Sequence, residues 1–190
     1  MAYETPEKTS TKRQEIIDRA YALFYDGGFH ATGIDKVMAD SGISKRTLYK
    51  YFPSKEHLIE AVLEHYGEVV EARMLVPALA RSDDPKARIL ALFDVRKELM
   101  DASDCLGCMA MKAAQEYRGK HAGIEAIGQR ASFFIEKTIA DLCREARLSD
   151  PDTRGRQVSM LLQGAVLTSQ VRGDTAVFAD ARAAAERLLA

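Results

Sequence analysis

Residues 45–51 carry the group of side chains in this sequence whose chemistry is easiest to interpret. The segment reads K-R-T-L-Y-K-Y, and its cations, hydroxyl and phenols come without a carboxylate among them. Cations and hydroxyls donate hydrogen bonds to phosphate oxygens, and long cationic side chains also reach base edges in the major groove of DNA. The composition of this segment therefore indicates contact with DNA.

The residues before this segment predict that it is a short helix behind a tight turn. Gly42 supplies the turn, because a residue without Cβ adopts a positive φ at little cost. Ser44 is placed to cap the helix by accepting a hydrogen bond from a backbone N–H of its first turn. Apolar residues 37–39 belong to a preceding helix, whose start is predicted by the capping-box spacing of Thr32 through Asp35.

Two further helices complete the predicted N-terminal domain. Residues 11–26 place apolar side chains on one stripe and stop at Gly27-Gly28. Ser54 begins the helix after the basic segment, with Glu56 in its first turn, where a carboxylate suits the helix dipole. Short helices arranged in this way are typical of a helix-turn-helix domain that binds DNA. The alternative is an ordinary helical hairpin whose solvated face happens to be basic.

The segment from about residue 11 to residue 66 resembles the N-terminal domain of the TetR family of bacterial repressors. The resemblance rests on I-I-D-R-A-Y-A-L-F at 16–24, G-F-H-A-T at 28–32, V-M-A-D-S-G-I-S at 37–44 and K-R-T-L-Y-K-Y-F-P-S-K-E-H-L at 45–58. Gly33 departs from the family, which often carries a phosphate-binding hydroxyl there, and Arg46 replaces a residue that is small in many relatives. The resemblance implies a ligand-responsive repressor that binds a palindromic operator in double-stranded DNA as a homodimer.

The residues expected to bind DNA fall into two groups. Lys45, Arg46 and Thr47, at the N-terminal end of the helix, are candidates for reading bases. The residues expected mainly to hold phosphate are Thr32, Tyr49, Tyr51 and Lys55, and Lys50 completes the basic face. Residues 8–55 hold nine Lys and Arg against five Asp and Glu, whereas the whole chain has a net charge of −1. A positive head on an acidic body favours DNA binding.

The sequence predicts an all-α fold of about nine helices, because no alternation typical of a strand extends over a useful length. The predicted domains are an N-terminal helix-turn-helix DNA-binding domain, 1–54, and a C-terminal helical effector-binding and dimerisation domain, 55–190. A long helix over 54–79 begins the second domain. Further helices are predicted over 85–100, over 105–117, after a loop at 118–123, from 150 to about 171, and over a last segment that ends near Leu189.

The last two predicted helices carry small and apolar residues that are expected to form a homodimer interface. Two such helix pairs can assemble into an intermolecular four-helix bundle, although the same residues could be ordinary core. A palindromic operator also requires two recognition helices. The predicted contact residues are Leu161, Leu162, Ala165, Thr168, Phe178 and Ala183.

A hydrophobic ligand pocket in the second domain is implied by the resemblance. Methionine and aromatic side chains adapt to varied apolar molecules, so the effector is expected to be small and apolar or aromatic. The predicted lining residues are Phe93, Arg96, Met100, Cys105, Met109 and Phe133. A buried Arg96 is costly unless it is paired or meets a polar group of a ligand.

Parts of the sequence are also compatible with other functions. The C-x-x-C of Cys105 and Cys108 could act as a redox switch, or could be two small core residues, whereas a zinc site would need two more ligands at matching spacing. A ligand-independent DNA-binding protein is a further alternative. The sequence has no nucleophile elbow, phosphate loop or H-E-x-x-H, so we expect no enzyme, metal or cofactor. Three cysteines and the lack of a signal peptide or membrane span favour a cytoplasmic protein.

Overall fold

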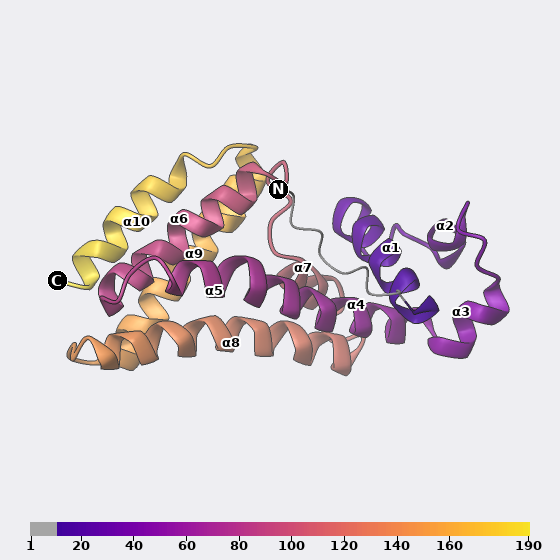
Figure 1. The fold of residues 1–190 in the computed structure, drawn as a ribbon, viewed down its shortest axis with the longest axis horizontal. Coiled ribbons are helices and arrows are strands. Elements are labelled where there is room, and N and C mark those ends of the chain that lie inside the picture. Colours follow the sequence, from indigo (N-terminus) through magenta and orange to yellow (C-terminus); the bar gives the residue numbers. More distant parts are fainter. Residues whose placement is uncertain (1–10) are drawn as a thin grey trace, which may run out of the picture. The chain divides into compact units, whose positions relative to one another are not determined.

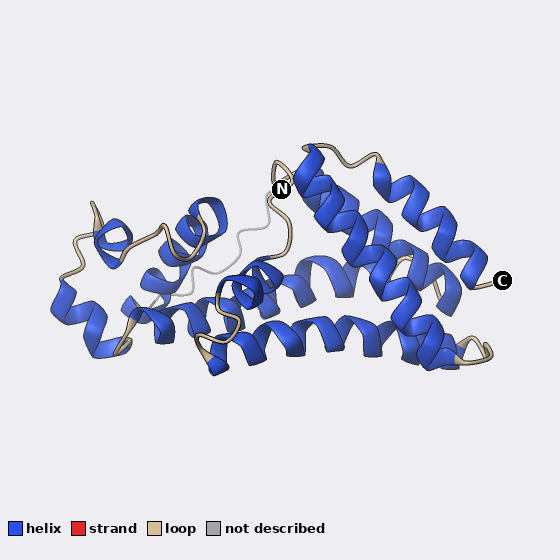
Figure 2. Cartoon of the chain, turned by 180° about the vertical axis from the view of Figure 1, so that it is seen from behind, coloured by secondary structure: helices blue, strands red, loops and turns tan. Residues whose placement is uncertain are grey.

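The computed structural model describes residues 11–190, and packing divides the chain into one unit that ends at Val62 and another over Leu63–Ala190. Every regular element in the described residues is helical (Figures 1 and 2). Helix α4 (Lys55–Val70), the π-helical segment η1 (Glu71–Leu75) and α5 (Val76–Leu79) follow one another without a break. Counted as one helix, they bring residues 11–190 to nine helices, which confirms the predicted all-α fold.

The N-terminal unit contains α1 (Lys12–Gly27), α2 (Ile34–Met38), α3 (Lys45–Tyr51) and the beginning of α4. Thr11 caps α1 by accepting a hydrogen bond from the Gln14 N–H at 3.3 Å, and Gly28 ends the helix with a φ of 77°. The apolar stripe of α1 is buried as predicted. The core of this unit consists of Ile16, Ile17, Ala20, Phe24, Phe29, Val37, Leu48, Phe52, Leu58, Ile59 and Val62.

The C-terminal unit contains α6 (Pro85–Asp101), α7 (Met109–Glu116), α8 (Ala122–Glu145), α9 (Pro151–Arg172) and α10 (Val177–Leu188). Helix α8 packs against α7 and α9, while α10 packs against α9 and α6 (Figure 1). Gly155 permits the close approach of α8 and α9, because a Cβ there would lie 2.7 Å from the Cβ of Ala140. The two helices are thus held too close for a side chain at that position.

The start of α6 follows its sequence signals, whereas the start of α7 does not. The helix begins at residue 85 as predicted, with Pro85 in the first helical position and Asp84 as its cap, which accepts a hydrogen bond from the Ala87 N–H at 2.9 Å. The helix predicted over 105–117 is wrong at its beginning. Cys105 has a φ of 58° and Gly107 a φ of 83°, conformations that cannot continue a right-handed helix, so α7 begins at Met109.

None of the helices within residues 11–190 combines the length and the apolar character that crossing a bilayer requires.

Candidate nucleic-acid interface and ligand cavity

The turn between α2 and α3 is built from the residues that the sequence singled out. Gly42 has a φ of 66°, and the Ser44 hydroxyl accepts a hydrogen bond from the Thr47 N–H at 3.1 Å. The Ser41 hydroxyl accepts from the Ile43 N–H at 3.0 Å and donates to the Met38 carbonyl at 2.6 Å. Leu48 is buried in the core, so the other side of α3 is left facing solvent.

The solvent-facing side of α3 presents most of the predicted DNA-binding residues. Those that are exposed are Lys45, Arg46, Tyr49, Lys50 and Tyr51, while Thr47 is half-buried with its hydroxyl 2.8 Å from that of Ser44. Lys45 forms an ion pair with Asp35 of α2 at 2.7 Å. The hydrogen bond that Lys45 donates to the Asp35 carboxylate, together with the negative charge of Asp35, raises the pKa of Lys45, so this side chain remains a cation.

Arg19 of α1 supports this geometry and was missed by the sequence reasoning. Its Nε donates to the Val37 carbonyl at 2.6 Å, and its Nη2 donates to the Ala39 carbonyl. These carbonyls end α2, where the helix dipole favours a cation. An arginine on the partly buried side of α1 was the available signal, but the sequence does not show which helix end it would reach.

Two predictions about Thr32 are wrong. Gly33 is the N-cap of α2, and no side chain caps that end, so the capping box is not formed. Thr32 is fully buried, and its hydroxyl donates to the Leu23 carbonyl of α1 at 3.3 Å. A side chain enclosed in this way cannot hold a DNA phosphate. Lys55 lies half-buried at the start of α4, which Ser54 caps by accepting from the His57 N–H at 3.3 Å.

Comparison with known proteins shows which protein family this arrangement resembles. The sequence profile described as "Bacterial regulatory proteins, tetR family" matches residues 16–62, the segment that contains the turn and α3. Over residues 16–62 the chain therefore matches the DNA-binding segment of the TetR family. The proteins that the chain matches there are transcription regulators and not enzymes.

Similarity to individual TetR-family proteins extends beyond the matched segment to different degrees. The HTH-type transcriptional regulator YxaF of Bacillus subtilis is 35% identical over 74 residues, which cover 38% of this chain and 38% of YxaF. The regulator LmrA of the same organism is 26% identical over 83% of this chain and 85% of LmrA. A crystal structure of a TetR-family regulator from Streptomyces coelicolor shares the fold, with a TM-score of 0.85 at 23% identity over 93% of each chain.

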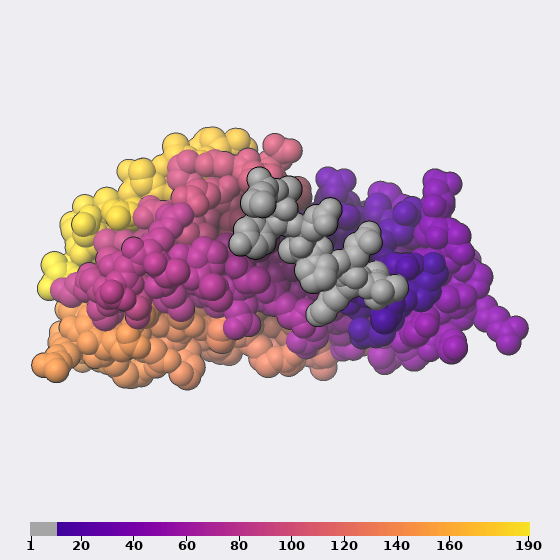
Figure 3. All heavy atoms as spheres, in the orientation of Figure 1, coloured from indigo at the N-terminus to yellow at the C-terminus, as the bar shows by residue number. Residues whose placement is uncertain are grey.

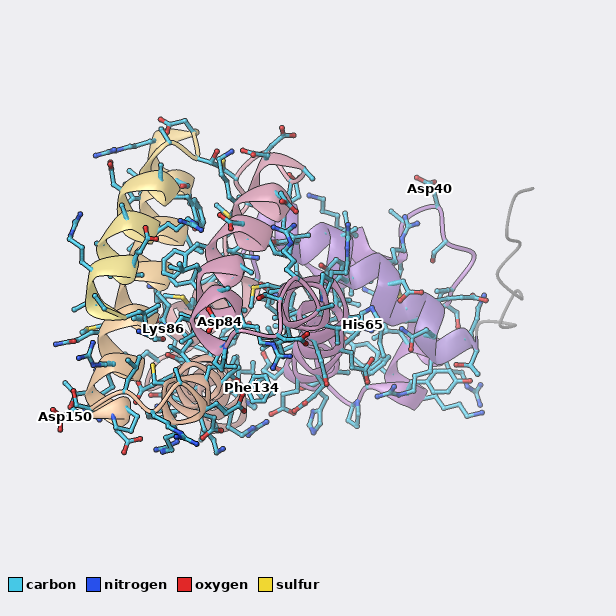
Figure 4. The ribbon with its side chains drawn as sticks, turned by 60° about the vertical axis from the view of Figure 1, so that its left-hand side comes forward. Asp40, His65, Asp84, Lys86, Phe134 and Asp150 are labelled. Carbon is cyan, nitrogen blue, oxygen red and sulfur yellow. The ribbon has the colours of Figure 1, made fainter. Side chains whose placement is uncertain are left out.

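The C-terminal unit contains a cavity of about 410 Å³, partly open to solvent, between α4, η1 and helices α6 to α9. Helix α4 and η1 contribute Leu63, Glu64, Tyr66, Gly67, Val70, Glu71 and Met74. The other helices and the segment before α7 contribute Arg96, Cys108, Ala110, Met111, Ile127, Arg130, Ala131, Ser132, Phe134, Ile135, Leu162, Gln163 and Val166. Phe134, labelled in Figure 4, projects from α8.

Of the predicted lining residues, only Arg96 borders this cavity. Phe93, Met100 and Met109 are fully buried in the core, and Cys105 is also buried away from the cavity wall. Phe133 is 64% exposed and does not border the cavity, whereas its neighbour Phe134 borders it and is itself 51% exposed. The prediction chose residues by type, and the rotation of α6, α7 and α8 decided which of two neighbouring apolar residues faced the cavity.

The predicted dimer residues also divide between core and surface. Leu162, Ala165 and Phe178 are buried within their own subunit, so they are wrong as contact residues. Ala183 is exposed, and Leu161 and Thr168 are half-buried. The large apolar side chains that face outward on α9 are Met160, Leu167 and Val171, at 65%, 48% and 79% exposure. Helix α10 forms part of the outer surface beside α9 (yellow in Figure 3).

The cysteines show no arrangement that would bind a metal. Within residues 11–190, no three or more His, Cys, Asp or Glu side chains lie close enough together to hold an ion. Cys105 and Cys143 are buried, and desolvation raises the pKa of the Cys143 thiol, which disfavours the reactive thiolate. Cys108 is half-buried and lines the cavity.

Proposed function

We propose that this TetR-family regulator is a homodimeric repressor, that it binds a palindromic operator, and that a small apolar or aromatic effector releases it. The observation that carries the proposal is the exposed face of α3, which offers Lys45, Arg46 and Lys50 and no carboxylate. Such a face can enter the major groove while the buried Leu48 holds the helix in place. Because its target is chromosomal DNA, the protein would act in the cytoplasm.

The roles proposed for individual residues follow from their positions on α3. Lys45, Arg46 and Thr47 occupy the N-terminal turn, from which side chains of a recognition helix reach bases. Tyr49, Tyr51 and the nearby Lys55 would hold phosphates, with Lys50 adding charge. Lys45 must exchange its carboxylate partner, Asp35, for DNA, so its net contribution to affinity would be smaller than that of Arg46.

The proposed dimer surface is the outward stripe of α9. Met160, Gly164, Leu167 and Val171 recur at helical spacing and are all exposed, with Gly164 allowing close approach of a second helix. A shallow groove lined by Leu161 and Leu188 continues this surface onto α10. Pairing two copies through the stripe would bury apolar side chains and supply two recognition helices, with half-sites about 34–36 Å apart.

Helix α4 with η1, here called the connecting helix, could transmit a change in the cavity to the N-terminal unit. Leu58, Ile59 and Val62 of α4 belong to the core of the N-terminal unit, while Gly67 and Val70 of the same helix line the cavity. A π-helical segment follows at once in η1, and such segments are frequent at functional sites. A ligand that binds one position of this helix more tightly would shift the dimer away from its DNA-binding state.

The DNA-binding assignment can be tested without knowing the effector. Random double-stranded DNA is selected for binding, and affinity for the enriched sequence is measured by fluorescence anisotropy across salt concentrations. Arg46→Ala should relax sequence preference by about 1–3 kcal/mol at one position. Lys55→Ala should weaken all sequences alike and reduce the salt slope by about one. The matched control is Lys137→Ala, which removes an exposed cation from α8.

We expect a palindrome to be enriched and Lys137→Ala to bind it like the parent protein. Enrichment of no sequence, or equal losses in all three variants, would contradict the proposal that α3 reads the operator.

A redox-sensing repressor is the alternative favoured by the position of Cys108 in the cavity wall. If Cys105 and Cys108 formed a switch, mild oxidant would release DNA from the native protein and not from a double serine variant. We expect the two proteins to respond alike. A release confined to the native protein would place the redox function above the ligand function.

A further inference from the structure

We propose that the cavity accepts an uncharged, mostly apolar ligand with one hydroxyl-like group, and that the amide of Gln163 recognises this group. This inference rests on the proposed function of the cavity as a ligand site. It goes beyond that function by naming the charge of the ligand, its polar group and the residue that selects it.

Each charged residue of the lining either has a partner within the protein or faces water. They comprise two carboxylates and two guanidinium groups, from Glu64, Glu71, Arg96 and Arg130. Arg130 donates to Glu64 at 3.0 Å, and the buried Arg96 donates from Nη2 to the Gly107 carbonyl at 2.7 Å. Glu71 is exposed to water. A charged ligand would have to displace these existing partners to gain a counter-ion of its own, and it would lose its hydration in a mostly apolar cavity, which is costly.

The neutral polar groups of the lining are organised around one amide. Gln163 on α9 donates from Nε2 to the Ser132 hydroxyl at 3.2 Å and to the Ser159 hydroxyl at 2.9 Å. Its two N–H donors are thus used inside the protein, which fixes the amide and leaves Oε1 to accept from a ligand. If the amide were instead flipped, so that Oε1 faced the two serines and Nε2 faced the ligand, a ligand hydroxyl could still bind, because a hydroxyl accepts as well as donates.

Apolar side chains form the rest of the wall around this amide. Leu63, Val70 and Met74 come from the connecting helix, and Ile127, Ile135 and Val166 come from α8 and α9. A ligand with several polar groups would leave all but one of them without a partner against these side chains. The arrangement therefore selects a single polar group at the Gln163 position.

Four probes with one bicyclic ring test the inference: 1-naphthol, 1-methylnaphthalene, 1-naphthoate and 1-naphthylmethylammonium. Their affinities for the full-length protein are measured by calorimetric titration at pH 7. We expect 1-naphthol to bind about tenfold more tightly than 1-methylnaphthalene, the gain of one good hydrogen bond. Both charged probes should bind more weakly than 1-naphthol.

Two substitutions at Gln163 locate the preference. Gln163→Met keeps the length of the side chain and removes its hydrogen bonds, so the tenfold difference between 1-naphthol and 1-methylnaphthalene should disappear. Gln163→Glu keeps the shape and adds a negative charge, so the preference should shift toward 1-naphthylmethylammonium. Thermal melting of each variant verifies folding, and the gain for the cationic probe cannot come from a misfolded protein.

Two substitutions on the opposite wall separate this inference from the ligand function itself. Gly67 lines the cavity, and a Cβ there would have no neighbour within 4 Å, so Gly67→Leu should narrow the cavity and weaken all probes. Gly67→Ala is the control, because it improves helix propensity similarly with a much smaller side chain.

Equal binding of all probes, tightest binding of a charged probe, or an unchanged preference in Gln163→Met would overturn the inference. If Gly67→Leu nevertheless weakens the binding of the probes in any of these cases, the cavity remains a ligand site and only the chemistry assigned to Gln163 is wrong. Binding of none of the probes would overturn both proposals.

Discussion

The recognition helix and the ligand cavity reach their geometry by opposite means. Helix α3 spans Lys45–Tyr51 and is positioned by a cap, a glycine turn and one buried leucine, all within a few residues of the side chains that it presents. The cavity draws its wall from α4, η1 and helices α6 to α9, so no local rule defines it. The recognition helix therefore depends on which residues are present, and the cavity depends on how distant helices are rotated.

The largest expected effect comes from placing one charge at two positions of α9. Leu162→Asp puts a carboxylate into a site that is 3% exposed, which should cost several kcal/mol and unfold the C-terminal unit. Val171→Asp adds the same residue at the outward stripe, where we expect a folded monomer. Circular dichroism melts and light scattering measure both results.

A folded Leu162→Asp monomer would show that the interface lies where the sequence placed it. A stable Val171→Asp dimer would remove the outward stripe of α9 from the interface.

A smaller effect is expected at Arg19, which contacts residues distant in the sequence, whereas the turn before α3 is otherwise held by contacts between neighbouring residues. Arg19→Ala removes the donors to the Val37 and Ala39 carbonyls, which should cost about 1.5–3 kcal/mol of stability and loosen the turn before α3. Operator affinity should fall with it. Arg13→Ala is the control, because it removes the same charge from the same helix. The Arg13 guanidinium lies 5.2 Å from the centre of the Phe52 ring.

If both arginine variants lose the same affinity and neither loses stability, Arg19 acts as a general cation near DNA. The turn would then be held by local contacts alone.

The smallest effect concerns Asp101, which joins the end of α6 to the segment before α10. Hydrogen bonds from Lys97 and Thr175, at 2.7 and 2.6 Å, lower the pKa of this carboxyl below its ordinary value of 3.8. A lowered folded pKa adds stability that is present above 3.8 and is lost as pH falls through the folded value. Because the site is largely exposed, Asp101→Asn should cost under about 1 kcal/mol at pH 7 and progressively less as the pH falls below 3.8. Denaturant unfolding at pH 7 and at a pH below 3.8 measures this, and an equal cost at both would mean that charge plays no part.

The contrast between the two regions also explains what could be predicted from sequence. Gly42 and Ser44 act through neighbours in the chain, so their roles were predictable from spacing. Phe133 and Phe134 are chemically identical neighbours that are both exposed, and only the packing of α8 places Phe134 at the border of the cavity and Phe133 away from it. In the same way, the sequence of α9 alone does not reveal that Leu162 is buried and Val171 is exposed.

Within the DNA-binding unit, the errors arose where a residue contacts a distant part of the chain. Thr32 matched a local capping pattern, but its hydroxyl bonds to Leu23 of α1 instead. In the C-terminal unit, the positive φ values at Asp104, Cys105 and Gly107 delayed the start of α7. A C-x-x-C pattern does not reveal these backbone conformations, so the late start could not be predicted.

The central claim is that occupancy of the cavity and occupancy of the operator oppose each other through the connecting helix. An effector found by thermal-shift screening is titrated into the protein with and without the selected operator, and the operator is titrated with and without the effector. The account predicts that each weakens the other by the same factor, about 5- to 150-fold. An effector that stabilises the protein and leaves operator affinity unchanged would contradict it.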